Sequence, residues 1–217
     1  AGPCKATDNR MSLASLVGIA MVVVLSHWPL ALPVGETQAA RSDDILSLPL
    51  RDQHGKSMTI RSFEGRALLL NFIFTHCVSA CHTQVKSLDA LRTALPANTR
   101  ARVRFLSISL DPSQDTPEML RKYAQAMGVD DAEWSFATGS PSDIAEITRG
   151  LGVKRESLAD GQIDHTLVVI LFDAKGRLMQ RYSGAQVNTA RLVREIDEVV
   201  RSSDAASESI PSRGRER

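Results

Sequence analysis

The sequence is poor in the features that mark several large classes of protein. Only three of its 217 residues are cysteine, so a scaffold held by many disulfides is excluded and the core has to come from packing. Lysine and arginine number 26 against 25 aspartates and glutamates, and this balance leaves no basic excess to pair with nucleic-acid phosphates. The glycines number 13 and the prolines nine, too few for a fibrous or low-complexity chain. The hydrophobic share of 43% and the charged share of 24% indicate an ordinary globular protein.

The N-terminal segment has the order of a targeting signal. An uncharged, mainly apolar stretch runs from Leu13 to Val34, with Lys5 and Arg10 before it and the small residues Gln38–Ala40 after it. We therefore interpret residues 1–40 as a signal peptide or a membrane anchor, and a buried core helix is the third alternative. Because cytoplasmic flanks carry the positive charge, the rest of the chain is predicted to lie outside the cytoplasm. The expected location is the periplasmic side of the inner membrane, either anchored there or secreted.

Residues 41–200 are predicted to form one globular domain, and residues 201–217, which lack apolar periodicity, a flexible tail. Apolar runs of strand length alternate with stretches at helical spacing. The predicted strands are two short ones within 46–60, then 67–74, 103–110, 134–138, 166–172 and 177–183. Helices are predicted between them and after the last strand, around 85–95, 117–128, 144–151 and 192–200. This order predicts an α/β fold with a mixed sheet flanked by helices and an N-terminal hairpin, which is the thioredoxin arrangement.

Cys77 and Cys81 lie between the first core strand and its helix, whereas Cys4 stands alone near the start. Backbone N–H groups at a helix start favour a thiolate, which is both a nucleophile and a metal ligand. One interpretation of the pair is a structural disulfide without chemistry. Three functional interpretations stay open: a copper site completed by an imidazole, disulfide exchange, and covalent haem attachment, because CVSACH resembles the Cys-x-x-Cys-His haem signal with one extra residue.

The missing imidazole has five candidates. His27 lies in the export segment, and His54 lies in a predicted turn. His76 and His82 flank the cysteines, but neighbouring positions of a strand or helix point in different directions. His165 directly precedes the strand 166–172, and loops at strand ends converge on one edge of such a sheet. It is the candidate most easily brought to the cysteines, although a lone histidine is more often structural.

Four stretches carry a resemblance to a known family. They read LLLNFIFTHCVSAC, LSISLDPSQDTPEMLRKYA, TGSPSDI and IDHTLVVILFDAKGRL, in that order, within about residues 46–200. The chain resembles the SCO/SenC family of copper-binding proteins for cytochrome c oxidase assembly. The resemblance implies a thioredoxin-like fold that binds one copper ion, Cu(I) or Cu(II). Its implied ligands are Cys77, Cys81 and His165.

The sequence departs from the family beside the cysteines. The family usually has proline after each cysteine, whereas this chain has Val78 and His82. Proline stiffens a loop, so its absence predicts a looser one. His82 also adds a fourth candidate ligand, or a base beside Cys81.

Two functions from different classes follow. The first is a metallochaperone that delivers copper to the binuclear copper centre of cytochrome c oxidase, outside the cytoplasmic membrane. Its expected partners are oxidase subunit II or another copper oxidase, a copper donor protein, and the membrane if the N-terminal segment is retained. The second is an enzyme, a thiol–disulfide oxidoreductase that reduces the oxidase cysteines before metallation. His165 separates the two, because thiol exchange has no obvious need for it; a copper sensor is a third alternative.

Overall fold

The computed structural model describes residues 45–77, 80–158 and 163–208. The predicted signal or anchor in residues 1–40 lies outside them, as do Val78 and residues 209–217. Within the described ranges, no helix has the length and apolar character needed to cross a membrane.

A mixed sheet of seven strands forms the centre of the fold, in the order β2-β1-β5-β4-β3-β8-β9. Its strands are β1 (Leu50–Asp52), β2 (Ser57–Met58), β3 (Ala67–Ile73), β4 (Val103–Ser109), β5 (Trp134–Gly139), β8 (Val168–Phe172) and β9 (Leu178–Ser183). The neighbours β3, β4 and β5 run parallel to one another. On one side of them the antiparallel strands β8 and β9 extend the sheet, and on the other side the β1–β2 hairpin does so. The predicted mixed sheet with an N-terminal hairpin is confirmed.

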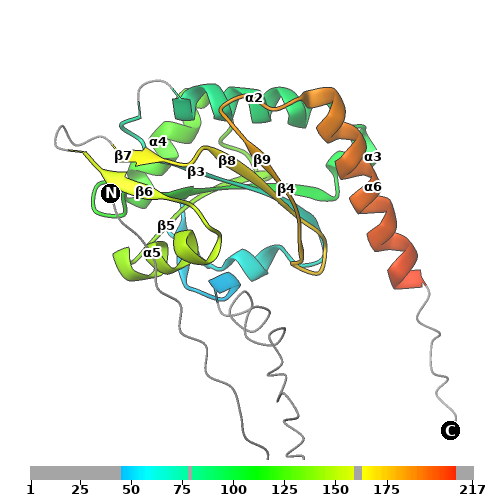
Figure 1. Ribbon diagram of the computed structural model, residues 1–217, viewed down its shortest axis with the longest axis horizontal. Helices are drawn as coiled ribbons and strands as arrows, with labels where there is room; N and C mark the ends of the chain where they lie inside the picture. Colours follow the sequence, from blue (N-terminus) through cyan, green and yellow to red (C-terminus); the bar gives the residue numbers. More distant parts are fainter. Residues whose placement is uncertain (1–44, 78–79, 159–162, 209–217) are drawn as a thin grey trace, which may run out of the picture. The chain divides into compact units, whose positions relative to one another are not determined.

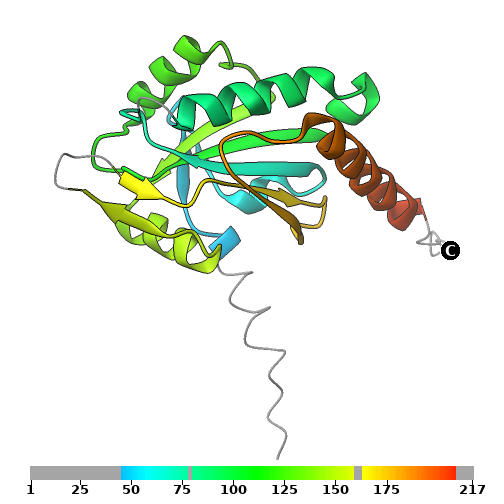
Figure 2. The ribbon, with the colours of Figure 1, turned by 45° about the horizontal axis from the view of Figure 1, so that its top comes forward.

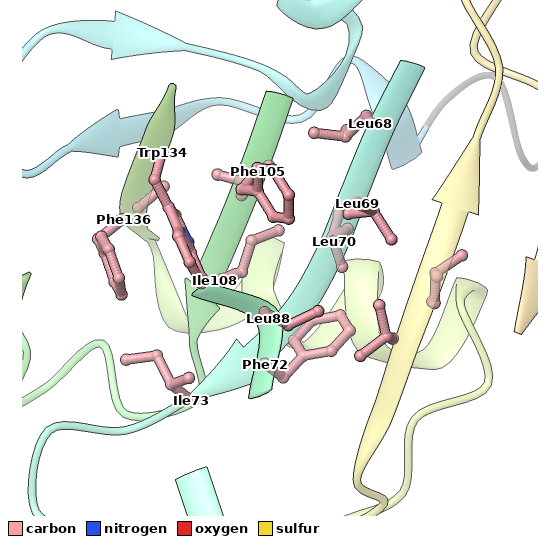
Figure 3. Packing of buried hydrophobic residues seen from close by; sticks show 14 of the residues in the cluster. Leu68, Leu69, Leu70, Phe72, Ile73, Leu88, Phe105, Ile108, Trp134 and Phe136 are labelled. Carbon is pink, nitrogen blue, oxygen red and sulfur yellow. The ribbon is translucent and has the colours of Figure 1, made fainter. Parts of the chain in front are cut away.

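Helices lie on both faces of this sheet. They are η1 (Ile60–Phe63), α2 (Ala80–Ala94), α3 (Ala97–Arg100), α4 (Pro117–Met127), α5 (Pro141–Gly150) and α6 (Thr189–Glu208). Figure 1 shows α2 and α4 on one face and α5 on the other, with α6 beside α2. Every residue of β3 is buried, as expected for a central strand covered on both faces. Figure 3 shows the large core side chains of β3, β4 and β5 packed together, among them Phe72, Phe105, Trp134 and Phe136.

Helices α4 and α5 each begin with a capping side chain followed by a proline. Thr116 Oγ1 accepts a hydrogen bond from the N–H of Met119, and α4 ends at Gly128, whose φ of 74° suits glycine. Ser140 Oγ likewise accepts from the N–H of Asp143 at the start of α5. Both helices carry proline in the first turn, where its missing N–H costs no helical hydrogen bond.

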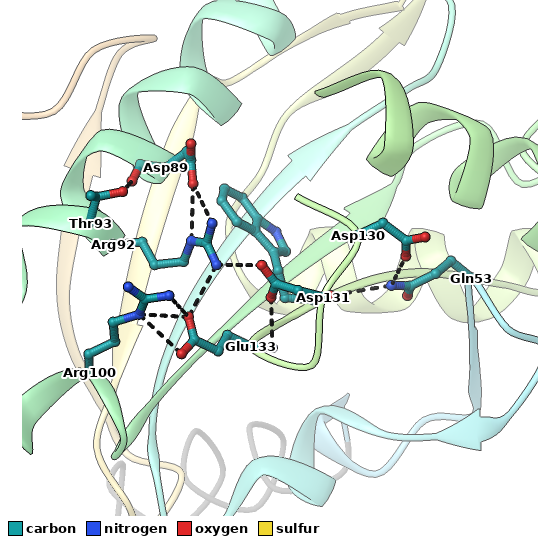
Figure 4. A network of polar contacts seen from close by, with 9 residues as sticks. Gln53, Asp89, Arg92, Thr93, Arg100, Asp130, Asp131 and Glu133 are labelled. Atoms are coloured by element: carbon teal, nitrogen blue, oxygen red, sulfur yellow. Dashed lines mark hydrogen bonds and ion pairs between the residues drawn. The ribbon is translucent and has the colours of Figure 1, made fainter. Parts of the chain in front are cut away.

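A buried arginine ties the end of α2 to the segment before β5 (Figure 4). Arg92 donates two hydrogen bonds to Asp89 Oδ1, at 3.0 and 2.7 Å, and one to Glu133 Oε2 at 3.1 Å. It also pairs with Asp131, and Arg100 binds Glu133 from α3. The charge of a buried arginine is thus matched by carboxylates, as burial requires.

Two boundaries differ from the sequence predictions. The strand predicted at 166–172 begins at Val168, and His165 ends a separate strand β7 (Ile163–His165), which within the described residues pairs only with β6 (Arg155–Ser157). Helix α6 continues to Glu208, so residues 201–208 of the predicted tail are helical. The polar sequence of residues 201–208 has no apolar stripe that would predict a helix. In the helix that forms, the hydroxyls of Ser202 and Ser203 donate hydrogen bonds to the carbonyl of Val199.

Candidate metal centre

Both cysteines lie at the junction of β3 and α2. The N–H of Cys77 donates to the carbonyl of Phe74 at 3.1 Å, which closes a turn after the strand. One helical turn later, the N–H of Cys81 donates to Cys77 Sγ at 3.3 Å. Both residues are thiols and not a disulfide. Cys77 is 7% exposed and Cys81 is 0% exposed, so the first sulfur lies nearer to the surface.

A buried carboxylate fixes the loop that leads to Cys77. Asp115, which is 0% exposed, accepts from the N–H of Thr75 at 3.1 Å and from Thr75 Oγ1 at 2.6 Å. It also accepts from Ser109 Oγ at 2.6 Å. Charged acceptors make the stronger hydrogen bonds, so Asp115 holds the cysteine loop against β4. The sequence analysis did not assign Asp115 to the site.

His165 reaches the cysteine pair from β7, although it follows Cys81 by 84 residues. Figures 1 and 2 show β7 and the start of α2 at the same end of the sheet. His165 Nε2 lies 3.7 Å from Cys81 Sγ, and Nδ1 lies 3.2 Å from the carbonyl oxygen of Thr166. A carbonyl can only accept, so this contact places the proton on Nδ1 and leaves the lone pair of Nε2 facing the sulfur. The edge of Phe74 packs against the ring, with 6.1 Å between the centroids.

Burial dominates the electrostatics of these groups. It raises the pKa of the Cys81 thiol well above its ordinary value, and the neighbouring Cys77 adds to this, while backbone hydrogen bonds oppose it. Burial also lowers the pKa of His165, against the smaller effects of the Thr166 carbonyl and Asp164. The metal-free site therefore holds Cys81 as a neutral thiol beside a neutral imidazole. The argument that a helix start favours a thiolate is wrong for Cys81, because desolvation of the charged form outweighs the helix end.

The other histidines in the described part of the chain do not face the cysteine pair in this way, and His27 lies outside it. His82 stacks on Tyr123 of α4, with ring centroids 5.4 Å apart. His76 is exposed and contacts Thr75, and His54 is exposed near Asp130 in the turn between β1 and β2.

Tyr123 is a neighbour of the site that the sequence analysis did not assign. Its hydroxyl is buried and has no hydrogen-bond partner in the described part of the chain. Burial raises the pKa of Tyr123, and negative charge at Cys81 and Cys77 would raise it further. The phenol therefore stays protonated. The helical spacing of apolar residues along α4 predicts that Tyr123 is a core residue, but only the fold shows that it lies beside the thiols.

The donors suit a soft or borderline metal ion. Two sulfurs and one imidazole nitrogen form a set typical of copper or zinc. Within residues 45–77, 80–158 and 163–208, no three His, Cys, Asp or Glu side chains already surround one position, so a shared ion would have to draw these donors together. Such an ion would also displace the proton of Cys81, because only the thiolate is a good ligand.

Comparison with known proteins identifies the family of the chain. The SCO1/SenC family pattern matches residues 39–201. The SCO1 protein homolog of Bacillus subtilis (strain 168) is 29% identical over 139 residues, which cover 63% of this chain and 72% of that protein. The solved structure of Arabidopsis thaliana ScoI with copper bound has a TM-score of 0.64 and 25% identity, and the match covers 71% of this chain and 96% of that one. Bradyrhizobium japonicum ScoI with copper bound has a TM-score of 0.61 and 26% identity, covering 70% and 97%. Because the SCO1/SenC pattern spans residues 39–201, most of the chain, the chain belongs to the SCO1/SenC family.

Proposed function

We propose that this chain is a copper chaperone that binds one copper ion through Cys77, Cys81 and His165 and delivers it to the binuclear copper centre of cytochrome c oxidase. The observation that carries the proposal is the position of His165, with Nε2 3.7 Å from Cys81 Sγ and Nδ1 3.2 Å from the carbonyl oxygen of Thr166. A dithiol that only exchanges electrons has no need of an imidazole lone pair directed at its buried sulfur. The client is oxidase subunit II or another copper oxidase, as the family resemblance implies.

Copper is the cargo, and the chain's own residues explain how it is held and released. Thiolates suit Cu(I), and an imidazole extends the set to Cu(II). Three protein ligands leave room for an incoming ligand from a client. Cys77 is the more exposed sulfur, so exchange would begin at Cys77 while Cys81 and His165 retain the ion.

The proposed location is the periplasmic side of the inner membrane, with the chain anchored or secreted there. The support is the positive flank and the apolar stretch before residue 40. Protease added to intact spheroplasts should digest the domain. Full protection until the membrane is disrupted would contradict this location.

Copper titration of the reduced, purified full-length chain tests the function. We expect one Cu(I) per chain, and proton release as the thiols become ligands. A reduced chain that stays metal-free under excess Cu(I) would rule out the chaperone role. Delivery is tested with an apo oxidase fragment that carries the binuclear site, where copper should leave the chain and appear in the fragment.

A thiol–disulfide oxidoreductase is the second candidate, and the unequal burial of the two sulfurs favours it. Cys77 is near the surface and accepts an N–H at the start of α2, whereas Cys81 is fully buried behind it. Cys77 would attack a client disulfide, and Cys81 would then displace the client sulfur. The client gains two electrons and two protons, and the chain is left with a Cys77–Cys81 disulfide. The chain would then be an enzyme.

A further inference from the structure

A chain of buried hydrogen bonds crosses the core and ends next to the candidate metal centre. Trp134 Nε1 donates to Ser107 Oγ at 2.9 Å, and Ser107 Oγ donates to Asn71 Oδ1 at 2.7 Å. Asn71 Nδ2 donates to Gln84 Oε1 at 3.0 Å, and Gln84 Nε2 donates to the carbonyl of Gly184 at 2.9 Å. An indole N–H can only donate and a carbonyl can only accept, so the two ends fix the direction of every bond and both amide orientations.

Gln84 connects the helix of one candidate ligand to the strand of another. It lies on α2 three residues after Cys81, so the two side chains share a helix face. The N–H of Gly184 donates in turn to the carbonyl of Leu167 at 2.9 Å. Leu167 is two residues after His165. The path from Cys81 to His165 therefore runs through Gln84, Gly184 and Leu167.

This path adds to the few contacts that hold β7 in place, which include the buried side chain of Ile163 and the packing of His165 on Phe74. Among the described residues β7 pairs only with β6, whose three residues are all exposed, and neither strand belongs to the main sheet. Sulfur and imidazole come from different elements, so their 3.7 Å separation depends on how the end of β7 is fastened to α2. The Gln84 amide is 0% exposed, and its oxygen and its nitrogen each have a hydrogen-bond partner, which makes it a rigid fastening.

We propose that Gln84 is a positioning residue that sets the distance between His165 and Cys81 by holding Gly184, and through it Leu167, against α2. For its effect on copper, the proposal rests on the proposed function. Outer partners that orient metal ligands commonly change metal affinity by about 10–100-fold when they are replaced. Gln84 would act in this way without touching the metal.

Gln84→Met and Ser107→Ala form a matched pair of variants. Gln84 and Ser107 are both 0% exposed, and each change removes two of the hydrogen bonds that connect Trp134 to Gly184. Only Gln84→Met cuts the link to Gly184. We expect Gln84→Met to lower the Cu(II) affinity about tenfold and to shift the sulfur-to-copper charge-transfer band. The Cu(II) affinity of Ser107→Ala should stay within about twofold of the parent value, and its charge-transfer band should be unchanged. The hydrogen bonds lost in this variant lie on the far side of Asn71 from Gln84.

A metal-free readout separates this inference from the proposed function. Amide hydrogen exchange of β6 and β7 should become faster in Gln84→Met than in Ser107→Ala at equal global stability. Equal exchange in the two variants, or an equal loss of Cu(II) affinity, would overturn the positioning role. If the parent chain binds no copper, the chaperone function fails, and the exchange comparison alone decides the role of Gln84. If Gln84→Met does not fold, Gln84→Asn, which keeps the amide but shortens its reach, is compared with Ser107→Ala in its place.

Discussion

Replacing His165 with alanine should abolish copper delivery while leaving the thiol couple intact. The change removes the imidazole whose Nε2 faces Cys81 Sγ at 3.7 Å, but neither sulfur. Cu(II) should suffer most because it favours nitrogen ligands, while two thiolates still hold Cu(I) more weakly. Loss of an outer partner of a ligand costs about 10–100-fold in affinity, so loss of the ligand itself should lower Cu(II) affinity by at least about 100-fold.

The same variant should stay folded, which makes the copper result interpretable. It loses the hydrogen bond from Nδ1 to Thr166, worth about 0.5–1.5 kcal/mol. It also loses the edge contact with Phe74, worth about 0.5–1.5 kcal/mol. The expected cost of about 1–3 kcal/mol is smaller than the roughly 5–15 kcal/mol that stabilises a typical domain.

The assay compares copper content, the reduction potential of the cysteine pair, and oxidase maturation across variants. His165→Ala should lose Cu(II) and maturation but keep a couple that can be oxidised and reduced, whereas Cys77→Ala and Cys81→Ala should lose both properties. His76→Ala and His82→Ala are the controls, since they remove imidazoles beside the cysteines that do not face the pair. Normal oxidase maturation in His165→Ala together with failure of the cysteine variants would refute copper delivery and favour thiol reduction.

Further predictions concern stability and pH. Asp115→Asn should lower the free energy of unfolding by about 3 kcal/mol, measured by urea denaturation, because hydrogen bonds to a charged group are worth about 1.5–3 kcal/mol each and Asp115 accepts two from Thr75. Tyr123→Phe should leave that free energy unchanged or raise it by about 1 kcal/mol, because the buried hydroxyl has no partner in the described residues. The free energy should fall as the pH rises above 9.0, by up to about 1.4 kcal/mol per unit, because the unfolded chain loses the Cys81 proton there while burial raises the pKa of the folded thiol. It should also fall as the pH drops below 6.5, because burial lowers the pKa of folded His165 and the unfolded chain takes up that proton first.

Each of these predictions has its own control and contrary result. Ser113→Ala removes an exposed hydroxyl from the same loop as Asp115 and should change stability little. A large loss in Tyr123→Phe would mean that the hydroxyl has a partner in solution. The alkaline slope should weaken in Cys81→Ala between pH 9.0 and 10.0, below the range where tyrosine contributes, and the acid slope should weaken in His165→Ala. Unchanged slopes in these variants would contradict the assignment.

The parts of the fold that sequence predicts well are those with a local cause. The strand at 67–74 is a nearly continuous apolar run, and the start of α5 has a serine and a proline in fixed positions. The hairpin that carries His165 was not predicted, because Arg155–Ser157 are exposed and show no alternation of apolar and polar residues. No local pattern marks Gln84, because the Gly184 carbonyl to which its side chain donates lies 100 residues away.

The protonation state of the site escaped local reasoning for a similar reason. A helix start lowers the pKa of an exposed thiol, and the sequence shows that Cys81 is near one. The sequence does not show how deeply the sulfur is buried, and that burial reverses the direction of the shift. The family resemblance thus implied which side chains meet, but the charge they carry depends on the surroundings that the whole fold supplies.

The two candidate functions exclude each other at any one moment, because both use the same sulfur atoms. Oxidation joins Cys77 and Cys81 and removes two electrons and two protons, after which neither sulfur is a thiolate ligand. At the proposed site, copper binding would in turn engage both sulfurs and displace the Cys81 proton. Copper-loaded chain should therefore resist oxidation to the disulfide, and the disulfide form should take up no Cu(I) until it is reduced. Mass spectrometry after thiol alkylation measures the first, and copper titration of the oxidised chain measures the second. Uptake of one Cu(I) by the fully oxidised chain would show that the metal lies elsewhere and would remove these cysteines from the site.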